Sequence, residues 1–331
     1  MIDFKEKNII LFSPFGSCKS YSEEIRDELI QRGANVAFYD ERPSQSVVTK
    51  IYIYLFRRFF PSLFINYIKK VIKECPFEIV DYILVVRGQG FDKTVLSMLR
   101  AKYPGVKIIL YQWDSISSIN APNVVHEYDR AFSYDPSDVS ANHYFVFRPT
   151  FYLTQYKDLV KQNSYKYDIC FVGTLYKDRW PIIKRFKDYI EGQQFIPSFY
   201  LYLSSKIVYL LYRFTSKDFA PISIIHFDLL NGKDYMSLVN ESRCILDINY
   251  TEQKGLSLRA YEALASQKKY ITTNYEIKNY DFYNPQNILV VESNHIEIPK
   301  DFIESPFEPV DNGVLYKYSV KGFIDDIFQS F

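Results

Sequence analysis

This 331-residue chain has no excess of charge of either sign and no long hydrophobic run. Lysine and arginine number 40 and aspartate and glutamate number 39, so the overall charge neither attracts nucleic acid nor demands an acidic partner. No uninterrupted apolar stretch approaches the roughly 20 residues that a helix needs to span a bilayer. The apolar run near the N-terminus is broken by Ser13, Pro14 and Gly16, which predicts a first strand rather than a signal peptide. We therefore expect a soluble or peripheral protein.

Cysteine is scarce, and several common active-site motifs are missing. The four cysteines, at positions 18, 75, 170 and 244, show no paired spacing suited to zinc, and a reduced cytoplasmic setting is the simplest interpretation. Gly88 and Gly90 lack the third glycine of a dinucleotide-binding loop, which makes an NAD site a poor fit. There is no Gly-Lys-Ser phosphate loop and no Gly-x-Ser-x-Gly nucleophile turn. The chain thus carries no signature of a dehydrogenase, a P-loop NTPase or an α/β-hydrolase.

Aromatic residues are abundant, with 30 tyrosines and 27 phenylalanines, and they concentrate in segments 51–73 and 195–214. Both segments mix aromatic and aliphatic side chains with lysine or arginine and carry almost no acid. Such amphipathic segments can lie in a membrane interface, with the cations toward anionic lipid. The alternative is ordinary buried helices, or a strand and a helix, with cations that reach out to solvent. Contact with a membrane would bring the protein to a lipid-linked partner.

Apolar segments of strand and helix type alternate along the chain. In the first half the predicted strands are 8–13, 35–39, 80–87 and 106–113, and the predicted helices are 20–32 and 92–103. In the second half the alternation resumes with strand 167–172, a helix after 178, a strand–helix–strand unit at 244–274 and a strand at 287–291. Alternation of this kind predicts α/β architecture, with parallel sheets covered by helices on both faces.

The length suits two domains of ordinary size. We expect a first domain at 1–150, a polar connection up to 166, a second domain at 166–313 and a C-terminal helix at 314–331. Ligands of open parallel sheets bind beyond the carboxyl ends of the strands. We therefore expect an active site between the two domains, formed by the loops 13–20, 88–91, 113–118, 173–179 and 250–257.

The segment 244–274 is the most informative part of the sequence. Its predicted helix follows the Gly255 turn and uses Leu258 and Tyr261 for its core face. Arg259 and Glu262 lie on another face near the helix start, where the macrodipole disfavours a cation by roughly 0.3–1 kcal/mol. A bound phosphate would explain this arginine, because helix N-terminal N–H groups and a guanidinium both bind anions. The alternative is an exposed pair of side chains worth roughly 0.2–0.5 kcal/mol.

Three stretches resemble a known family. The string Q-x-G-L-S-x-R-x-x-E-A-L at 253–264, followed by K-K and I-T-T-N up to 274, is similar to the nucleotide-sugar segment of GT-B glycosyltransferases. The resemblance is strongest to the CgeB-like branch and to the lipopolysaccharide or capsule biosynthesis branch. Y-x-W-D-S at 111–115 and Y-D-I-C-F-V-G-T-L at 167–175 carry the same resemblance. It implies two Rossmann-like domains that face a central cleft, a nucleotide-sugar donor in the second and a glycan or lipid-linked acceptor in the first.

The resemblance also implies residue roles. Gly173 and Thr174 would face the donor, and Glu262 would hold its ribose hydroxyls. The expected donor-side residues are Gly173, Thr174, Arg179, Gln253, Lys254, Gly255, Ser257, Arg259 and Glu262. Retaining members of the fold usually carry two glutamates eight positions apart, whereas Glu252 and Glu262 are ten apart. Inversion or retention of the sugar's stereochemistry therefore stays open.

No Asp-x-Asp triplet occurs, so we expect chemistry without a metal and no cofactor beyond the nucleotide-sugar substrate. The departing phosphate would be stabilised by the helix N-terminus at 256–258, by Arg259 and by Arg179 or Lys254.

For the acceptor side we expect the base to be Asp114, which follows a strand and stands beside Trp113. Its alternative role is to cap the segment 115–118. Further acceptor-side candidates are Ser13, Phe15, Gly16, Arg87, Gln89 and Trp113.

The function expected on this basis is a hexosyl- or deoxyhexosyltransferase of bacterial surface polysaccharide synthesis. It would be cytoplasmic, at the inner face of the membrane if the aromatic segments touch lipid. A sugar-nucleotide epimerase of the same fold and a non-catalytic glycan- or nucleotide-binding module are the alternatives. The sequence leaves the nucleotide, the sugar, the acceptor and the oligomeric state open.

Overall fold

A computed structural model describes residues 2–16, 18–44, 60–116, 124–159, 162, 164–176, 178–216, 218–249 and 253–329. Parts of the expectations above fall on residues 51–59, 117–118 and 250–252, among them Glu252, and lie outside the described residues. The chain forms two compact units, each with its own six-stranded parallel sheet. Unit 1 comprises Met1–Leu153, Gln253–Gly255 and Tyr316–Phe331, and unit 2 comprises Thr154–Glu252 and Leu256–Leu315.

Unit 1 is built on a sheet whose strand order is β2-β1-β3-β4-β5-β6. Its strands are β1 (Asn8–Ser13), β2 (Asn35–Asp40), β3 (Tyr82–Val86), β4 (Lys107–Gln112), β5 (Arg130–Ser133) and β6 (Phe145–Phe147). Successive residues of β1, from Ile9 to Phe12, are all fully buried. A strand that is buried on both faces belongs to a sheet covered on both sides, which explains its continuous apolar sequence.

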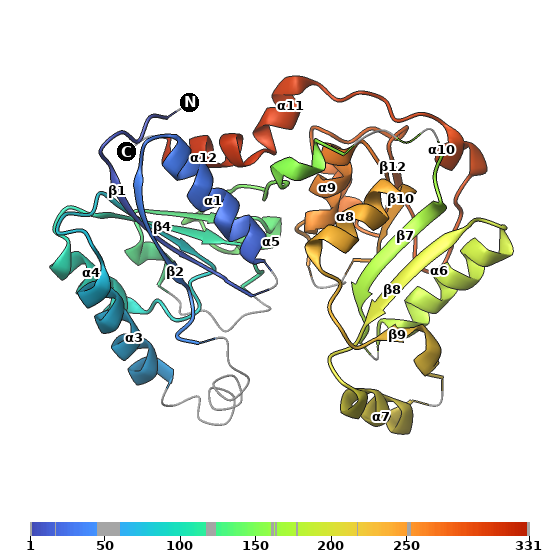
Figure 1. Ribbon diagram of the computed structural model, residues 1–331, viewed down its shortest axis with the longest axis horizontal. Coiled ribbons are helices and arrows are strands. Elements are labelled where there is room, and N and C mark those ends of the chain that lie inside the picture. The colour runs from blue at the N-terminus through green and yellow to red at the C-terminus, as the bar shows by residue number, and fades with distance from the viewer. Residues whose placement is uncertain are drawn as a thin grey trace. The chain divides into compact units, whose positions relative to one another are not determined.

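Helices cover both faces of this sheet (Figure 1). They are α1 (Lys19–Gln31), α3 (Phe60–Glu74), α4 (Lys93–Lys102), α5 (Pro136–Ala141) and α12 (Val320–Phe328), with the 3₁₀ turn η2 (Val125–Glu127). Phe64 and Ile68 of α3 are buried in the core, so in this described part of segment 51–73 the apolar face packs inside unit 1. α12 returns from the end of the chain to α1, where Arg32 forms ion pairs with Glu28 and Asp325.

Unit 2 has the strand order β12-β11-β10-β7-β8-β9. Its strands are β7 (Tyr167–Thr174), β8 (Pro197–Tyr202), β9 (Ile225–His226), β10 (Ser242–Asp247), β11 (Lys269–Thr272) and β12 (Ile288–Val290). Its helices are α6 (Trp180–Gly192), α7 (Lys206–Thr215), α8 (Gly232–Asn240), α9 (Leu258–Ser266) and α10 (Lys300–Glu304). α11 (Asn312–Lys317) spans the boundary of the units, and the 3₁₀ turns are η3 (Thr154–Tyr156), η4 (Ile222–Ile224) and η5 (Tyr275–Asn279).

The predicted fold class is confirmed, since both sheets are parallel and of Rossmann type. In unit 1 the connections change direction between β1 and β3, and in unit 2 between β7 and β10. Such a switch point opens a crevice at the carboxyl ends of its two strands, because the adjoining loops run to opposite faces of the sheet. Each unit therefore offers one preferred ligand-binding edge. None of the helices in the described ranges combines the length and the apolar character needed to cross a membrane.

Candidate donor and acceptor sites

The switch point of unit 2 places Thr174, the last residue of β7, near Asp247, the last residue of β10. The Asp247 carboxylate is buried, and its Oδ2 accepts hydrogen bonds from Ser257 Oγ and Tyr270 Oη, both at 2.8 Å. Its Oδ1 lies 3.9 Å from Nη1 of Arg259. Two hydroxyl groups thus hold the carboxylate in place and leave its other oxygen toward the arginine.

Arg259 is the second residue of α9, and its Nε is buried without a hydrogen-bond partner in the described structure. Burial acts to lower the pKa of Arg259, but the neighbouring Tyr235, Asp247 and Glu262 raise it above its ordinary value. The side chain is therefore a cation. A buried guanidinium N–H without an acceptor is costly, and an oxygen-rich ligand would supply the missing acceptor.

A second arginine, Arg179, lies close enough to Asp247 to be influenced by its charge. Arg179 precedes α6, donates to the carbonyl oxygens of Thr174 (3.4 Å) and Ile248, and also has a buried Nε without an acceptor. Burial lowers the pKa of Arg179, nearby Arg259 lowers it further, and Asp247 opposes both effects. Gly173 leaves room for this arrangement, since a Cβ there would lie 2.7 Å from the Phe171 ring. Two guanidinium groups thus lie near Asp247, and each keeps a buried Nε without an acceptor in the described structure.

The start of α9 adds backbone N–H groups beside Arg259. Ser257 is the N-cap residue, but its hydroxyl binds Asp247 and makes no capping hydrogen bond. The first turn of α9 carries no acidic side chain either. The N-terminal N–H groups of this nine-residue helix therefore keep their anion-binding capacity beside Arg259.

Glu262 lies one turn further along α9 and is only 5 % exposed. Its Oε2 accepts a hydrogen bond from Tyr235 Oη at 2.9 Å. Burial, together with the charge of Glu262 and a hydrogen bond to it, raises the pKa of Tyr156. The rings of Tyr156 and Tyr235 meet edge to face at 6.5 Å. Arg259 and Glu262 are consequently built into a polar cluster and are not a solvated surface pair.

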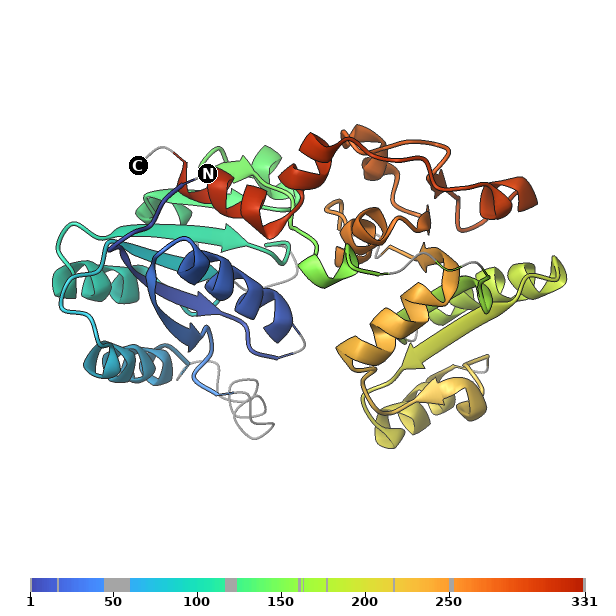
Figure 2. The same cartoon turned by 45° about the horizontal axis from the view of Figure 1, so that its top comes forward.

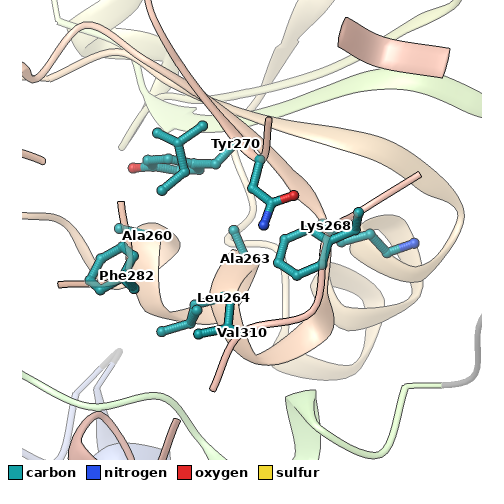
Figure 3. A pocket seen from close by; sticks show the side chains of 10 residues that line it. Ala260, Ala263, Leu264, Lys268, Tyr270, Phe282 and Val310 are labelled. Carbon is teal, nitrogen blue, oxygen red and sulfur yellow. The ribbon is translucent and has the colours of Figure 1, made fainter. Parts of the chain in front are cut away.

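The opposite face of α9 is closed by packing. Ala260, Ala263 and Leu264 meet Phe282 and Val310 around a space of only about 10 Å³ (Figure 3). A space of that size holds about one water molecule. A ligand of α9 therefore has to approach from the N-terminal side, where the arginines lie.

Unit 1 gathers charged side chains at the carboxyl edge of its own sheet. Arg87 follows β3, and its Nε lies 3.4 Å from Oε1 of Glu41, which follows β2, and 3.4 Å from Oδ2 of Asp114, which follows β4. Gln89 Oε1 accepts from Nη2 of Arg87 at 3.1 Å. Arg87 has φ 79°, a left-handed conformation that is unusual outside glycine and that clusters at functional sites.

The two carboxyl groups of this cluster differ in burial. Glu41 is 1 % exposed, neither oxygen accepts a hydrogen bond in the described structure, and its Oε1 lies 3.1 Å from Nε of Arg42. Burial raises the pKa of Glu41 to about 7, although the charge of Arg87 acts to lower it. Burial also raises the pKa of Asp114, again against Arg87. Two carboxyl groups with raised pKa values thus share one arginine, which makes them candidates for proton transfer.

Three of the other acceptor-side candidates, Ser13, Phe15 and Trp113, contact neighbouring side chains of unit 1. Ser13 is buried, with its Oγ 2.7 Å from Ser22 Oγ, and Phe15 packs against Phe38 at 4.6 Å. The Trp113 ring meets Tyr21 edge to face at 6.3 Å. Gly16 lies at the end of the same described loop as Phe15.

The predicted donor-side residues fall in both units. Gln253, Lys254 and Gly255 group with unit 1, whereas Ser257, Arg259 and Glu262 belong to unit 2.

No group of three or more histidine, cysteine, aspartate or glutamate side chains in the described ranges is placed to hold a metal ion.

Sequence reasoning missed Glu41, Asp247, Tyr156 and Tyr235. Asp247 belongs to the first strand of the unit predicted at 244–274, and nothing in the sequence marks its carboxylate as part of a site. The signal available for Glu41 was weak, namely an acid directly after a predicted strand.

No family model and no curated protein sequence matches the chain. Among solved structures, a glycosyltransferase from Rickettsia africae is similar at 12 % identity and TM-score 0.54, covering 98 % of this chain and 99 % of its own. The lipopolysaccharide outer core galactosyltransferase WaaB is 11 % identical with TM-score 0.51, over 98 % of this chain and 100 % of its own. A UDP-GlcNAc 2-epimerase from Methanocaldococcus jannaschii is 11 % identical with TM-score 0.51, over 98 % of this chain and 99 % of its own. These similarities establish the GT-B fold.

Proposed function

We propose that the protein is a glycosyltransferase that binds a nucleotide-sugar in unit 2 and moves its sugar to a glycan or lipid-linked acceptor. The observation that carries the proposal is the pair of partly buried arginines, Arg179 and Arg259, near Asp247 at the β7/β10 switch point, each with a buried Nε that has no acceptor in the described structure. The diphosphate of a nucleotide-sugar supplies the acceptor oxygens that these N–H groups lack.

Each donor-side residue then has a role. Arg179, Arg259 and the N-terminus of α9 bind the phosphates, and Asp247 orients Arg259. Glu262, fixed by Tyr235, accepts the ribose hydroxyls, as the family resemblance implies. The guanidinium groups also stabilise the charge that develops on the departing nucleotide, so the reaction requires no metal. Gly173, Thr174 and Ser257 complete the expected donor side in unit 2, whereas the other three candidates, Gln253, Lys254 and Gly255, group with unit 1.

Unit 1 supplies the base in this proposal. The acceptor oxygen attacks the anomeric carbon, the bond from that carbon to the phosphate oxygen breaks, and the acceptor proton passes to Asp114. Arg87 holds Asp114 in place at 3.4 Å. This step describes transfer with inversion, in which a carboxylate takes the acceptor proton directly.

The family resemblance supports the finer assignment. Three stretches similar to CgeB-like and lipopolysaccharide or capsule enzymes support a role in bacterial surface polysaccharide synthesis, on the cytoplasmic side of the membrane. A sugar-nucleotide 2-epimerase is the second candidate, because it would use the same phosphate site and because the paired carboxyl groups of unit 1 suit proton transfer at a sugar carbon. A binding module without turnover would keep the arginines and form no product.

A two-stage experiment tests the proposal. Thermal unfolding is followed with UDP, dTDP, GDP, ADP and CMP for the wild type, Arg259→Lys and Arg179→Lys, with the exposed Arg185→Lys on α6 as the control. A ligand at 100 times its Kd stabilises the folded state by about 2.7 kcal/mol. We expect one nucleotide to stabilise the wild type and the control but neither site variant, since lysine cannot replace a guanidinium fork.

The second stage offers the matching sugar-nucleotide and follows the products by nuclear magnetic resonance. Released nucleotide with a glycosylated acceptor supports the transferase, and an intact nucleotide with an inverted sugar carbon supports the epimerase. Stabilisation by no nucleotide would refute both.

A further inference from the structure

Helix α7 of unit 2 presents an apolar stripe to solvent. Its inner side chains Val208, Tyr209 and Tyr212 pack against the core of unit 2. Its outer side chains are largely exposed: Ile207 by 72 %, Leu210 by 54 %, Leu211 by 58 % and Phe214 by 88 %. These positions follow the spacing i, i+3, i+4 and i+7, which aligns side chains along one face of a helix. The helix is therefore apolar on two sides, and only one side has a partner in the described structure.

The sequence on both sides of the stripe carries only positively charged side chains. The sequence from 192 to 217 contains no aspartate or glutamate. Lys206 and Arg213 on α7 are both exposed. The nearest following acid in the sequence, Asp218, forms an ion pair with Lys184 at 2.9 Å. The outer face thus combines bulky apolar side chains with positive charge.

The position of α7 leaves this face accessible. Figures 1 and 2 show α7 at the outer edge of unit 2, beyond the short edge strand β9. A large apolar surface is rarely left in water by a monomeric protein unless it binds something. The positive flanks favour an anionic partner over a neutral one.

We propose that α7 docks unit 2 on an anionic lipid surface. The stripe of Ile207, Leu210, Leu211 and Phe214 enters the boundary between headgroups and acyl chains, and Lys206 and Arg213 contact lipid phosphates. The proposal does not depend on the transferase assignment. With that assignment, it brings the enzyme to the surface where a lipid-linked acceptor would be found.

A second copy of the chain is a less suitable occupant. A stable dimer interface buries roughly 800 Å² per partner, more than four side chains of this size can expose. Two stripes brought face to face would also bring like charges together, whereas a lipid surface offers opposite charge. Interfacial helices bind through an apolar face of this kind with cations beside it.

The test is sedimentation of the full-length protein with vesicles of phosphatidylcholine alone or mixed with phosphatidylglycerol. Leu211→Ser/Phe214→Ser removes half of the stripe, and Lys206→Glu reverses one charge. The matched control is Ile30→Ser/Ile79→Ser, which removes two exposed apolar side chains of unit 1 (49 and 73 % exposed). Because the apolar side chains are about half exposed or more and Lys206 is also exposed, we expect all variants to fold, with melting temperatures within a few degrees of the wild type.

We expect the wild type and the control to bind the anionic vesicles better than the neutral ones. Both α7 variants should lose roughly tenfold or more in partitioning, as expected when apolar area or charge is removed from an interfacial helix. Equal binding by wild type and Leu211→Ser/Phe214→Ser, or no binding by the wild type, would overturn the proposal. A wild-type dimer that Leu211→Ser/Phe214→Ser dissociates in analytical ultracentrifugation would overturn it in favour of a second copy.

Discussion

At the scale of single residues, the donor site is defined by unpaired hydrogen-bond donors. Arg179 and Arg259 both lie near Asp247, and both retain a buried N–H without an acceptor in the described structure. A protein stabilises such an arrangement poorly on its own, because an unpaired buried N–H keeps its desolvation cost. A bound anion removes that cost, so the apo protein should be less stable than the same protein with ligand.

Asp247→Asn tests this balance. The substitution keeps the shape of the side chain but removes a negative charge near Arg259 and Arg179, so the free energy of unfolding of the apo protein should fall by about 1–3 kcal/mol. The stabilisation gained from a nucleoside diphosphate should increase at the same time, since the ligand replaces the lost negative charge. Urea denaturation with and without nucleotide measures both effects. Asp168→Asn, at the partly buried pair with Arg243, is the control, and a parallel fall in stability and in nucleotide response would contradict the interpretation.

Glu41 predicts a pH dependence of stability in unit 1. Its pKa is about 7 in the folded protein against an ordinary 4.5, so between these values the folded state binds more protons than the unfolded state. The free energy of unfolding should therefore fall as pH rises from 4.5 through 7. At about 1.4 kcal/mol per pKa unit, the loss is at most about 3 kcal/mol.

Glu41→Gln should remove this dependence and become more stable relative to the wild type at pH 8 than at pH 5. Urea midpoints at the two pH values measure the difference, with the exposed Glu74→Gln as the control. A constant difference between Glu41→Gln and wild type across this range would show that Glu41 stays ionised in the folded protein.

The same residues show what a sequence can and cannot reveal about a site. Arg259 and Glu262 stand out because their spacing fits a helix face that the core does not use. Tyr235 and Asp247 do not stand out, because they belong to a helix and a strand that only the tertiary structure brings to α9. Glu41 looks like any acid after a strand, and its burial depends on how β2 and β3 pair with β1.

At the scale of elements, periodicity predicts the longer helices and the buried strands well. The predicted strand at 8–13 agrees with β1, and α1 and α4 lie close to their predicted ranges. The short strands β5, β6 and β9 are missed, because runs of two to four residues carry no measurable period. The segment 195–214 contains strand β8 and helix α7, which corresponds to the strand-and-helix alternative for its secondary structure. Its composition could not separate the packed face of α7 from the exposed one.

At the scale of the whole molecule, the sequence predicts two parallel sheets but not their strand orders. The order depends on which side of the first strand each connection returns to, and no local pattern records that choice. Both units place their switch point beside their first strand, β1 in unit 1 and β7 in unit 2. The charged clusters found at these two points differ. Unit 2 combines two arginines with a helix N-terminus, whereas unit 1 combines two carboxyl groups with Arg87.

Hydrogen exchange can decide which switch point receives the nucleotide. If the diphosphate binds at the β7/β10 edge, the backbone amides of 173–180 and 256–262 should exchange more slowly with nucleotide, because bound oxygens protect N–H groups and suppress local opening. Amides 13–16 and 87–91 of unit 1 should be unaffected by nucleotide alone, since Arg42 and Arg87 at that edge are already paired with carboxyl groups. Arg259→Lys provides the control and should lose the protection. Protection confined to unit 1 would move the donor site to the β1/β3 edge and reverse the roles assigned to the two units.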